Sequence, residues 1–264
     1  STVLLRFEYD YNAVDNRMHM WENNAQGTHI ATETYAYDEL SRLTNVTYKD
    51  NKTQAYTFDK VGNRLTLNDD GMLKTYTYNT INELTSSTEG TYTYDLNGNT
   101  LIDSQRSYAW DVQNRMTSVT KGNTTVNFTY RSDGLRARKQ VVGGLTTDYV
   151  YDGQTVIGEK RSDGKSVWYT PGPSGYINRT TVNDATGAVL DKEWFVYDGL
   201  GSCRAMVKPN TAGDNAIITA RFDYDVYGKV RTSSGSTESS FRYVGGSCGH
   251  PTDDETGLIY MRAR

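Results

Sequence analysis

A short motif recurs along the whole chain: two aromatic residues flank one other residue and are followed by aspartate or asparagine. YAYDELSRLTNV, YTFDKVGNRLTL and YAWDVQNRMTSV are three examples. The second aromatic falls at Tyr9, Tyr37, Phe58, Tyr78, Tyr94, Trp110, Tyr130, Tyr151, Tyr197, Tyr224 and Tyr243, in steps of about 16 to 28 residues with one gap of about 46. A repeat of this kind constrains the fold more than any other feature, because each copy must build the same local unit.

Each copy predicts a strand, a turn and a return strand. Side chains alternate along an extended chain, so the two aromatics lie on one face while the residue between them points the other way. The following aspartate can accept hydrogen bonds from backbone N–H groups two residues on, and Gly or Asn supplies a positive φ. Asn63-Arg64-Leu65 and similar triplets then begin a Thr-rich return strand.

Tyrosine dominates the residues available for a core. Only 36% of the chain is apolar, but Tyr accounts for 21 residues against 4 Trp and 6 Phe. Tyrosine can be buried ring-first with its hydroxyl hydrogen-bonded, so much of the core must be tyrosine. A chain of 264 residues is long enough to bury such a core.

The predicted fold class is therefore all-β, an antiparallel β-hairpin ribbon in which each repeat rests on its neighbours. A β-sandwich or a solid barrel with periodic turns is the alternative that periodicity leaves open. NDATGAVLDKEWF comes closest to a helical apolar stripe and still falls short of one. We expect a single domain over residues 1–264, with regular repeats over 1–160, an irregular loop or insertion over 161–191 that contains Pro171 and Pro173, and a distinct closing segment over 192–264.

Composition argues against several partners. The formal net charge is −4 with no basic block, which disfavours nucleic acid, and no apolar run is long enough for membrane insertion. The first residues lack the regions of a signal peptide. Cys203 and Cys248 have no zinc-type spacing, and we expect small buried thiols in preference to a single bridge. We expect no metal and no cofactor.

The repeat resembles that of YD-repeat (Rhs-repeat) proteins, which include bacterial polymorphic toxins, the C component of insecticidal toxin complexes, wall-associated proteins and animal teneurins. The closing stretches YDGLGSCRAM, FDYDVYGKV and FRYVGGSCGHPTDDETGLIYMRAR are similar to the Rhs-associated core of that family. The resemblance implies a ribbon that spirals into a hollow β-shell, or closes into a barrel-like solenoid. It also implies a bacterial, secreted or cell-surface parent.

In that family the core continues into a self-cleavage region and a variable C-terminal toxin, which we expect to be missing from this sequence. The resemblance therefore implies a structural shell module that encloses or presents an absent C-terminal effector. A partial shell also leaves an unpaired sheet edge, so we expect self-association through that edge or repacking into a closed barrel.

One pattern matches a catalytic motif. Gly245-Gly246-Ser247-Cys248-Gly249 has the form of the nucleophile elbow of esterases, with His250 and Asp253 or Asp254 close by. That elbow needs a strand, a tight turn and a helix, and its acid and histidine normally arrive from separate loops. Pro251 and Gly257 interrupt any helix here, which favours a glycine-rich turn.

Two further functions stay open. Asp253, Asp254 and Glu255 supply carboxylates for a glycoside hydrolase, which needs two carboxyl groups about 5 to 10 Å apart. A tyrosine-lined surface also suits carbohydrate binding, since sugar rings stack on aromatic faces. We lean towards a non-enzymatic module, with hydrolase and carbohydrate-binding module as alternatives.

We assign the repeated aromatic and acidic residues to packing and to turn formation. They are Tyr37, Asp38, Phe58, Asp59, Tyr94, Asp95, Trp110, Asp111, Tyr151, Asp152, Tyr197, Asp198, Tyr224 and Asp225.

Overall fold

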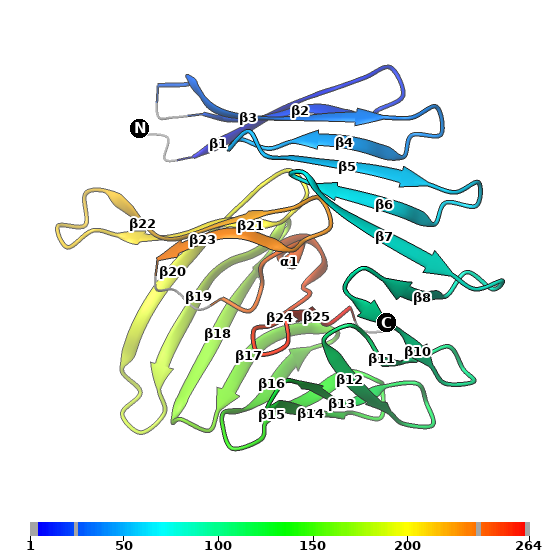
Figure 1. Ribbon diagram of the computed structural model, residues 1–264. Coiled ribbons are helices and arrows are strands. Elements are labelled where there is room, and N and C mark those ends of the chain that lie inside the picture. Colours follow the sequence, from blue (N-terminus) through cyan, green and yellow to red (C-terminus); the bar gives the residue numbers. More distant parts are fainter. Residues whose placement is uncertain (1–4, 24–25, 236–238, 262–264) are drawn as a thin grey trace. The chain divides into compact units, whose positions relative to one another are not determined.

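The computed structural model describes residues 5–23, 26–235 and 239–261. The chain divides into two compact units, residues 1–105 and 106–264. Hydrogen-bonded antiparallel hairpins follow one another in sequence order in both, which confirms the expected all-β hairpin ribbon (Figure 1). None of the described helices is long and apolar enough to cross a membrane.

The described residues of unit 1 form eleven strands, of which the first nine make one sheet in the order of the sequence. They are β1 (Arg6–Tyr11), β2 (Arg17–Asn23), β3 (His29–Tyr37), β4 (Leu43–Thr47), β5 (Thr53–Phe58), β6 (Arg64–Asp69), β7 (Met72–Tyr78), β8 (Leu84–Ser87), β9 (Gly90–Thr91), β10 (Thr93–Tyr94) and β11 (Thr100–Ile102). Buried Tyr48 and Tyr56 donate their hydroxyls to Gln54 Oε1, each at 2.6 Å.

Unit 2 contains twelve strands that pair in sequence order, followed by a C-terminal segment. The strands are β12 (Arg106–Trp110), β13 (Met116–Lys121), β14 (Thr124–Tyr130), β15 (Arg136–Val141), β16 (Thr146–Asp152), β17 (Thr155–Arg161), β18 (Lys165–Gly172), β19 (Gly175–Asn183), β20 (Val189–Tyr197), β21 (Cys203–Pro209), β22 (Ala216–Tyr224) and β23 (Val230–Gly235). The C-terminal segment, residues 239–261, holds the one-turn α1 (Gly245–Cys248) and the two-residue strands β24 (Thr252–Asp253) and β25 (Leu258–Ile259).

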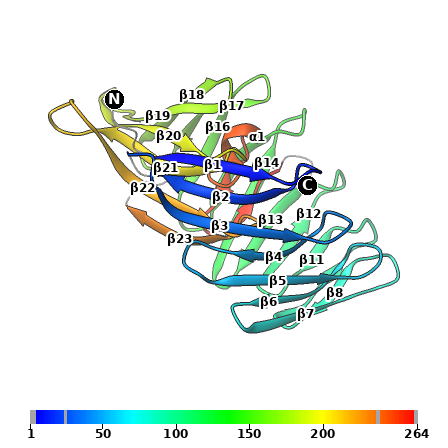
Figure 2. The same cartoon turned by 90° about the horizontal axis from the view of Figure 1, so that it is seen from above.

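The C-terminal segment lies on one face of the unit 2 sheet, which we call the docking face and which carries Phe128, Lys139 and Tyr169 (Figures 1 and 2). Phe241 is fully buried there, with its ring centroid 4.8 Å from that of Tyr169 and 4.4 Å from that of Tyr176. A second small core joins Val119, Val126 and Phe128 to Leu258 of β25. The segment is thus part of the core of unit 2.

The repeat builds its turns as the sequence predicts. Asp38 Oδ1 accepts the N–H groups of Leu40 (3.0 Å) and Arg42 (2.9 Å), and Asp59, Asp95, Asp111, Asp198 and Asp225 bind the N–H groups two and four residues on in the same way. Asp152 differs: it ends β16 opposite Thr155, because Gly153 at φ +56° allows a tighter turn.

In most repeats the second aromatic is a tyrosine whose hydroxyl ties its hairpin to the preceding one. The Tyr37 hydroxyl donates to Arg17 O at 3.0 Å, and Tyr130 donates to Met116 O at 2.7 Å. Tyr78, Tyr94, Tyr151, Tyr197 and Tyr224 make the corresponding bond, whereas Tyr243 donates to Val226 O in the turn between β22 and β23. In most repeats a register shift precedes this residue, and the two rings of a repeat still meet: Phe195 and Tyr197 stack with centroids 5.6 Å apart.

Residues 161–191 do not form the irregular loop that we expected. They hold β18, β19 and the beginning of β20 in regular antiparallel pairing. Pro171 is tolerated because it falls at a register shift, where a missing N–H does least harm to the ladder. Buried Tyr176 donates to Val156 O at 2.8 Å, so the repeat contact continues through the apparent gap.

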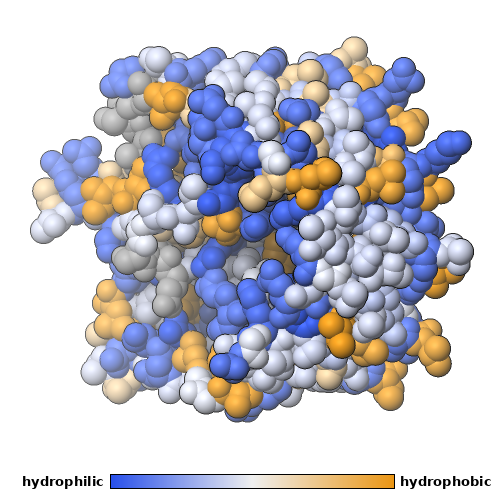
Figure 3. All heavy atoms as spheres, viewed as in Figure 1, coloured by the Kyte–Doolittle hydropathy of each residue, from blue (hydrophilic) through white to orange (hydrophobic). Residues whose placement is uncertain are grey.

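Most exposed apolar side chains stand singly among hydrophilic ones on the face drawn in Figure 3. In unit 1, exposed apolar side chains project from five hairpin turns, namely Val14, Leu40, Val61, Ile81 and Leu96. Cys203 is a buried free thiol beside Met206 Sδ, and burial raises its pKa to about 12.

Replacing Tyr130 by Phe should lower the free energy of unfolding by about 1 kcal/mol, the net contribution of one hydrogen bond, because it removes the bond to Met116 O. Urea denaturation measures the change. Tyr11→Phe is the matched control, since Tyr11 is 57% exposed and should change stability by less than about 0.5 kcal/mol. Equal effects of both substitutions would contradict the packing role.

Stability should fall in acid. Hydrogen bonds lower the pKa of the turn carboxylates: the Arg42 backbone N–H acts on Asp38, the Asn99 amide on Asp95 and the Arg115 guanidinium on Asp111. Unfolded aspartate has a pKa of about 3.9, so this stabilisation is complete above that value and is lost as pH falls through the lower folded-state pKa. Urea midpoints between pH 6 and pH 2 should drop, with a shallower drop in Asp111→Asn. A flat profile would refute the capping account.

Candidate functional site

The residues that the sequence offers for an esterase lie in α1 and in the stretch that follows it. Ser247 lies in α1, a single turn, and its side chain is outside the described residues, as is that of Cys248. His250 lies in the loop after α1. Asp253, the acid that such a triad would use, points to an arginine of the sheet instead. The strand–turn–helix support of a nucleophile elbow is not formed around α1, whose N-cap Val244 adopts the left-handed conformation.

The centre of the contact between the sheet and the C-terminal segment is Arg136, the first residue of β15. Its side chain is 2% exposed, and its Nη1 donates to Asp253 Oδ2 at 2.7 Å. The guanidinium carbon lies 4.3 Å from the Tyr260 ring centroid and 4.9 Å from that of Phe128. Burying a guanidinium is costly unless it is paired, and here one carboxylate and several ring faces replace its water.

Sequence reasoning missed Arg136 as a site residue. It occupies the repeat position of Arg17 and Arg64, at the start of the return strand after a turn. Those arginines also lie over rings, Arg17 at 4.6 Å from Tyr35 and Arg64 at 4.3 Å from Tyr76. The position could be read from the repeat, but the burial of this one copy depends on a segment more than a hundred residues later.

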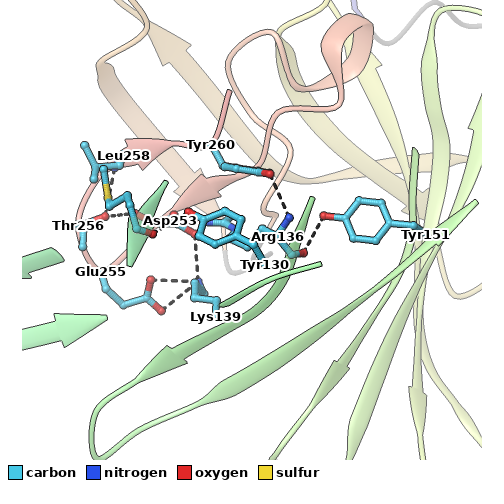
Figure 4. Close-up of polar contacts among 10 residues, drawn as sticks. Tyr130, Arg136, Lys139, Tyr151, Asp253, Glu255, Thr256, Leu258 and Tyr260 are labelled. Carbon is cyan, nitrogen blue, oxygen red and sulfur yellow. Dashed lines mark hydrogen bonds and ion pairs between the residues drawn. The ribbon is translucent and has the colours of Figure 1, made fainter. Parts of the chain in front are cut away.

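A second ionic contact lies beside the first. Lys139 Nζ is 3.1 Å from Glu255 Oε2 and 3.6 Å from Asp253 Oδ1. Asp254 forms an ion pair with Arg242 at 2.8 Å. The three carboxylates that the sequence offered as acid and base are thus each held by a cation, and Figure 4 shows Asp253 and Glu255 turned towards Arg136 and Lys139.

Backbone hydrogen bonds lock the same region. The Arg136 N–H donates to the Tyr260 hydroxyl at 3.0 Å, and Arg106 Nη2 donates to Thr256 O at 2.8 Å. The Tyr151 hydroxyl donates to Arg136 O at 2.9 Å (Figure 4). Burial raises the pKa of neighbouring Tyr130, so its phenol stays neutral and contributes no charge. The arrangement is a clamp that holds a segment in place.

Two hollows border this clamp. One of about 50 Å³ is lined by Trp110, Phe128, Arg136 and Tyr260, among others. The other, of about 210 Å³, lies between the sheet and the C-terminal segment and includes Lys139, Glu159 and Glu255. No group of three or more His, Cys, Asp or Glu in the described part of the chain could hold a metal ion.

Comparison with known proteins identifies the family to which this repeat belongs. The model of the family described as "Teneurin YD-shell" matches residues 1–264. The chain belongs to this family. Its YD-repeat resemblance is therefore confirmed over the full length.

The chain also matches two curated relatives by sequence. It is 33% identical over 241 residues to the tRNA3(Ser)-specific nuclease WapA of Bacillus spizizenii and 32% identical over 241 residues to the tRNA nuclease WapA of Bacillus subtilis. Each match covers 86% of this chain and 10% of the relative, so the chain spans about a tenth of their length.

Among solved structures, the crystal structure of TcdB2-TccC3 without its hypervariable C-terminal region superposes with a TM-score of 0.65. The match has 17% identity and covers 100% of this chain and 15% of that one. At this identity the likeness shows the fold alone, a YD-shell type β-sheet.

The clamp makes a direct prediction about this YD-shell segment. Arg136→Met should reduce the free energy of unfolding by about 3 to 5 kcal/mol, because it leaves Asp253 buried without its closest cation. Urea denaturation gives the change. Arg138→Met is the control, since the Arg138–Asp148 pair is about half exposed and should contribute less than about 1 kcal/mol. A loss at Arg136 no larger than that of the control would show that the buried pair does not hold the segment.

Proposed function

We propose that this YD-shell segment is a non-enzymatic wall module of an Rhs-type toxin or cell-surface protein. Its repeats build the wall. Its C-terminal segment docks on that wall and so fixes the position at which a C-terminal effector begins. The longer parent is a bacterial protein that is secreted or held at the cell surface.

One observation carries the proposal: the chain uses a buried arginine and a lysine of the wall to hold residues 239–261 on the docking face. A segment that only ended the sheet would need no buried ion pair, and burying ions is worthwhile mainly where it fixes one arrangement among several. The clamp therefore supports a role in positioning whatever follows the segment.

The repeat residues support the same role. Their hydroxyl and carboxylate groups make hydrogen bonds inside the wall: Tyr37 and Tyr130 bind the preceding hairpin, and Asp38 caps its own turn. Side chains committed in this way are poorly placed to contact a substrate. Wall building accounts for their recurrence without any catalytic role.

The WapA relatives are tRNA nucleases by name. They match this chain over only about a tenth of their length. We therefore propose that their nuclease activity resides outside the stretch that matches this chain. The effector of this protein is accordingly a separate region of the parent. Self-association through a sheet edge stays a prediction.

The hydrolase alternative has weaker support. Asp253, Asp254 and Glu255 are each engaged with a cation, whereas a glycosidase needs one carboxyl group free to protonate the leaving group and a second one to act on the sugar.

Protection of the downstream region tests the proposal. In the longer parent protein, Arg136→Met should speed protease cleavage after residue 264 by at least about tenfold relative to wild type, because the segment is released from the wall. Arg138→Met should leave the rate unchanged. Time courses followed by gel and mass spectrometry give the rates.

Two results would contradict the proposal. One is equal cleavage of the wild type and Arg136→Met in parents that remain folded. The other is turnover of ester or glycoside substrates by the purified chain that Glu255→Gln or Asp254→Asn abolishes.

A further inference from the structure

The larger hollow beside the clamp is a formed polar cavity. It measures about 210 Å³, room for several water molecules. One side is the docking face of β15–β19, and the other is the C-terminal segment. The side chains that matter are Lys139, Thr147, Glu159, Tyr169, Ser240 and Glu255. We propose that this cavity binds a small neutral polyhydroxylated ligand about the size of a single sugar ring.

Glu159 is the side chain that most constrains what the cavity can bind. It is 6% exposed, accepts a hydrogen bond from the Tyr169 hydroxyl at 3.0 Å, and forms no ion pair within the described residues. Burial raises its pKa, with Tyr169 opposing the shift. A buried carboxyl group without an ion-pair partner needs hydrogen-bond donors, and the hydroxyl groups of a ligand can supply them.

The other charged groups are already balanced. Lys139 is paired with Glu255, Arg161 Nη2 lies 2.9 Å from Asp163 Oδ2, and Arg179 Nη2 lies 2.9 Å from Glu193 Oε2. An anion entering the cavity would meet Glu159, Asp254 and Glu255, and a cation would meet Lys139, Arg161 and Arg179. Each would therefore bring an unbalanced charge into a largely buried space, which is costly.

An apolar ligand fits no better. It would separate Glu159, Thr147 and Ser240 from water without replacing their hydrogen bonds. A neutral ligand with several hydroxyls can replace those bonds, and the rings of Tyr149 and Tyr169 offer apolar surface for its C–H groups. The cavity therefore favours ligands that carry no charge and several hydroxyl groups.

Binding should also tighten the clamp. Ser239, Ser240, Asp254 and Glu255 form one wall, so the cavity exists only while the C-terminal segment is docked. A ligand that binds only the docked form stabilises it by mass action, and at about 100 times Kd it lowers the undocked fraction about 100-fold. This coupling goes beyond the wall role proposed above and does not depend on an effector.

Titration of the intact chain with D-glucose, D-galactose and myo-inositol tests the proposal, with acetate and ethanolamine as charged probes of similar or smaller size. We expect saturable calorimetric binding of at least one neutral probe and none of the charged ones. Glu159→Leu, which keeps bulk but removes hydrogen bonding, should weaken binding at least tenfold. Tyr169→Phe provides a second variant if Glu159→Leu does not fold, and Glu39→Gln, at an exposed position, is the control.

Hydrogen exchange of the same samples distinguishes the cavity from surface binding. Backbone amides of residues 252–259 should exchange more slowly with saturating ligand, up to about 100-fold where exchange needs undocking. The proposal is overturned if no neutral probe saturates, if a charged probe binds better, or if binding leaves these amides or the folded Glu159 and Tyr169 variants unaffected.

Discussion

The hydrogen bond from a repeat tyrosine to a carbonyl of the preceding hairpin is the contact on which the rest of the YD-shell fold depends. It recurs in both units, for example from Tyr37 to Arg17 O and from Tyr130 to Met116 O. Each bond joins one hairpin to its neighbour only, so the wall behaves as a nearly one-dimensional array whose stability is a sum of local terms. A chain with a modest apolar content can then form a stable sheet, because its phenol groups are buried with their hydroxyls satisfied.

Against that regular background, one repeat position has two uses. The arginine that begins a return strand lies over an aromatic ring at Arg64, with the Tyr76 centroid 4.3 Å away. At Arg136 the C-terminal segment covers the same position. The guanidinium there is buried, lies over the Tyr260 ring and is paired with Asp253. A clamp is thus obtained from a structural repeat without new local chemistry. The neighbouring cavity arises from the same covering, since one of its walls is that segment.

The sequence was sufficient to predict what depends on nearby residues. Alternating aromatics and a turn aspartate are local signals, so the hairpins and the caps at Asp38 or Asp111 could be predicted. The prediction of an irregular loop over residues 161–191 was wrong because it relied on the prolines there. Nothing local indicates that Pro171 falls at a register shift. The pairing of Arg136 with Asp253 could not be predicted either, since 117 residues separate the two and no local pattern links them. The same holds for Glu159, whose burial depends on which segment covers the sheet.

A double-mutant cycle on Arg136 and Asp253 tests the central claim most directly. Unfolding free energies of wild type, Arg136→Met, Asp253→Leu and the double variant give the coupling energy between the two side chains. We predict a coupling above about 2 kcal/mol, with the double variant more stable than either single one, because an uncompensated buried charge is worse than an apolar pair. The exposed pair of Arg138 and Asp148 should give less than about 1 kcal/mol in a parallel cycle. Additive effects at Arg136 and Asp253 would contradict the account.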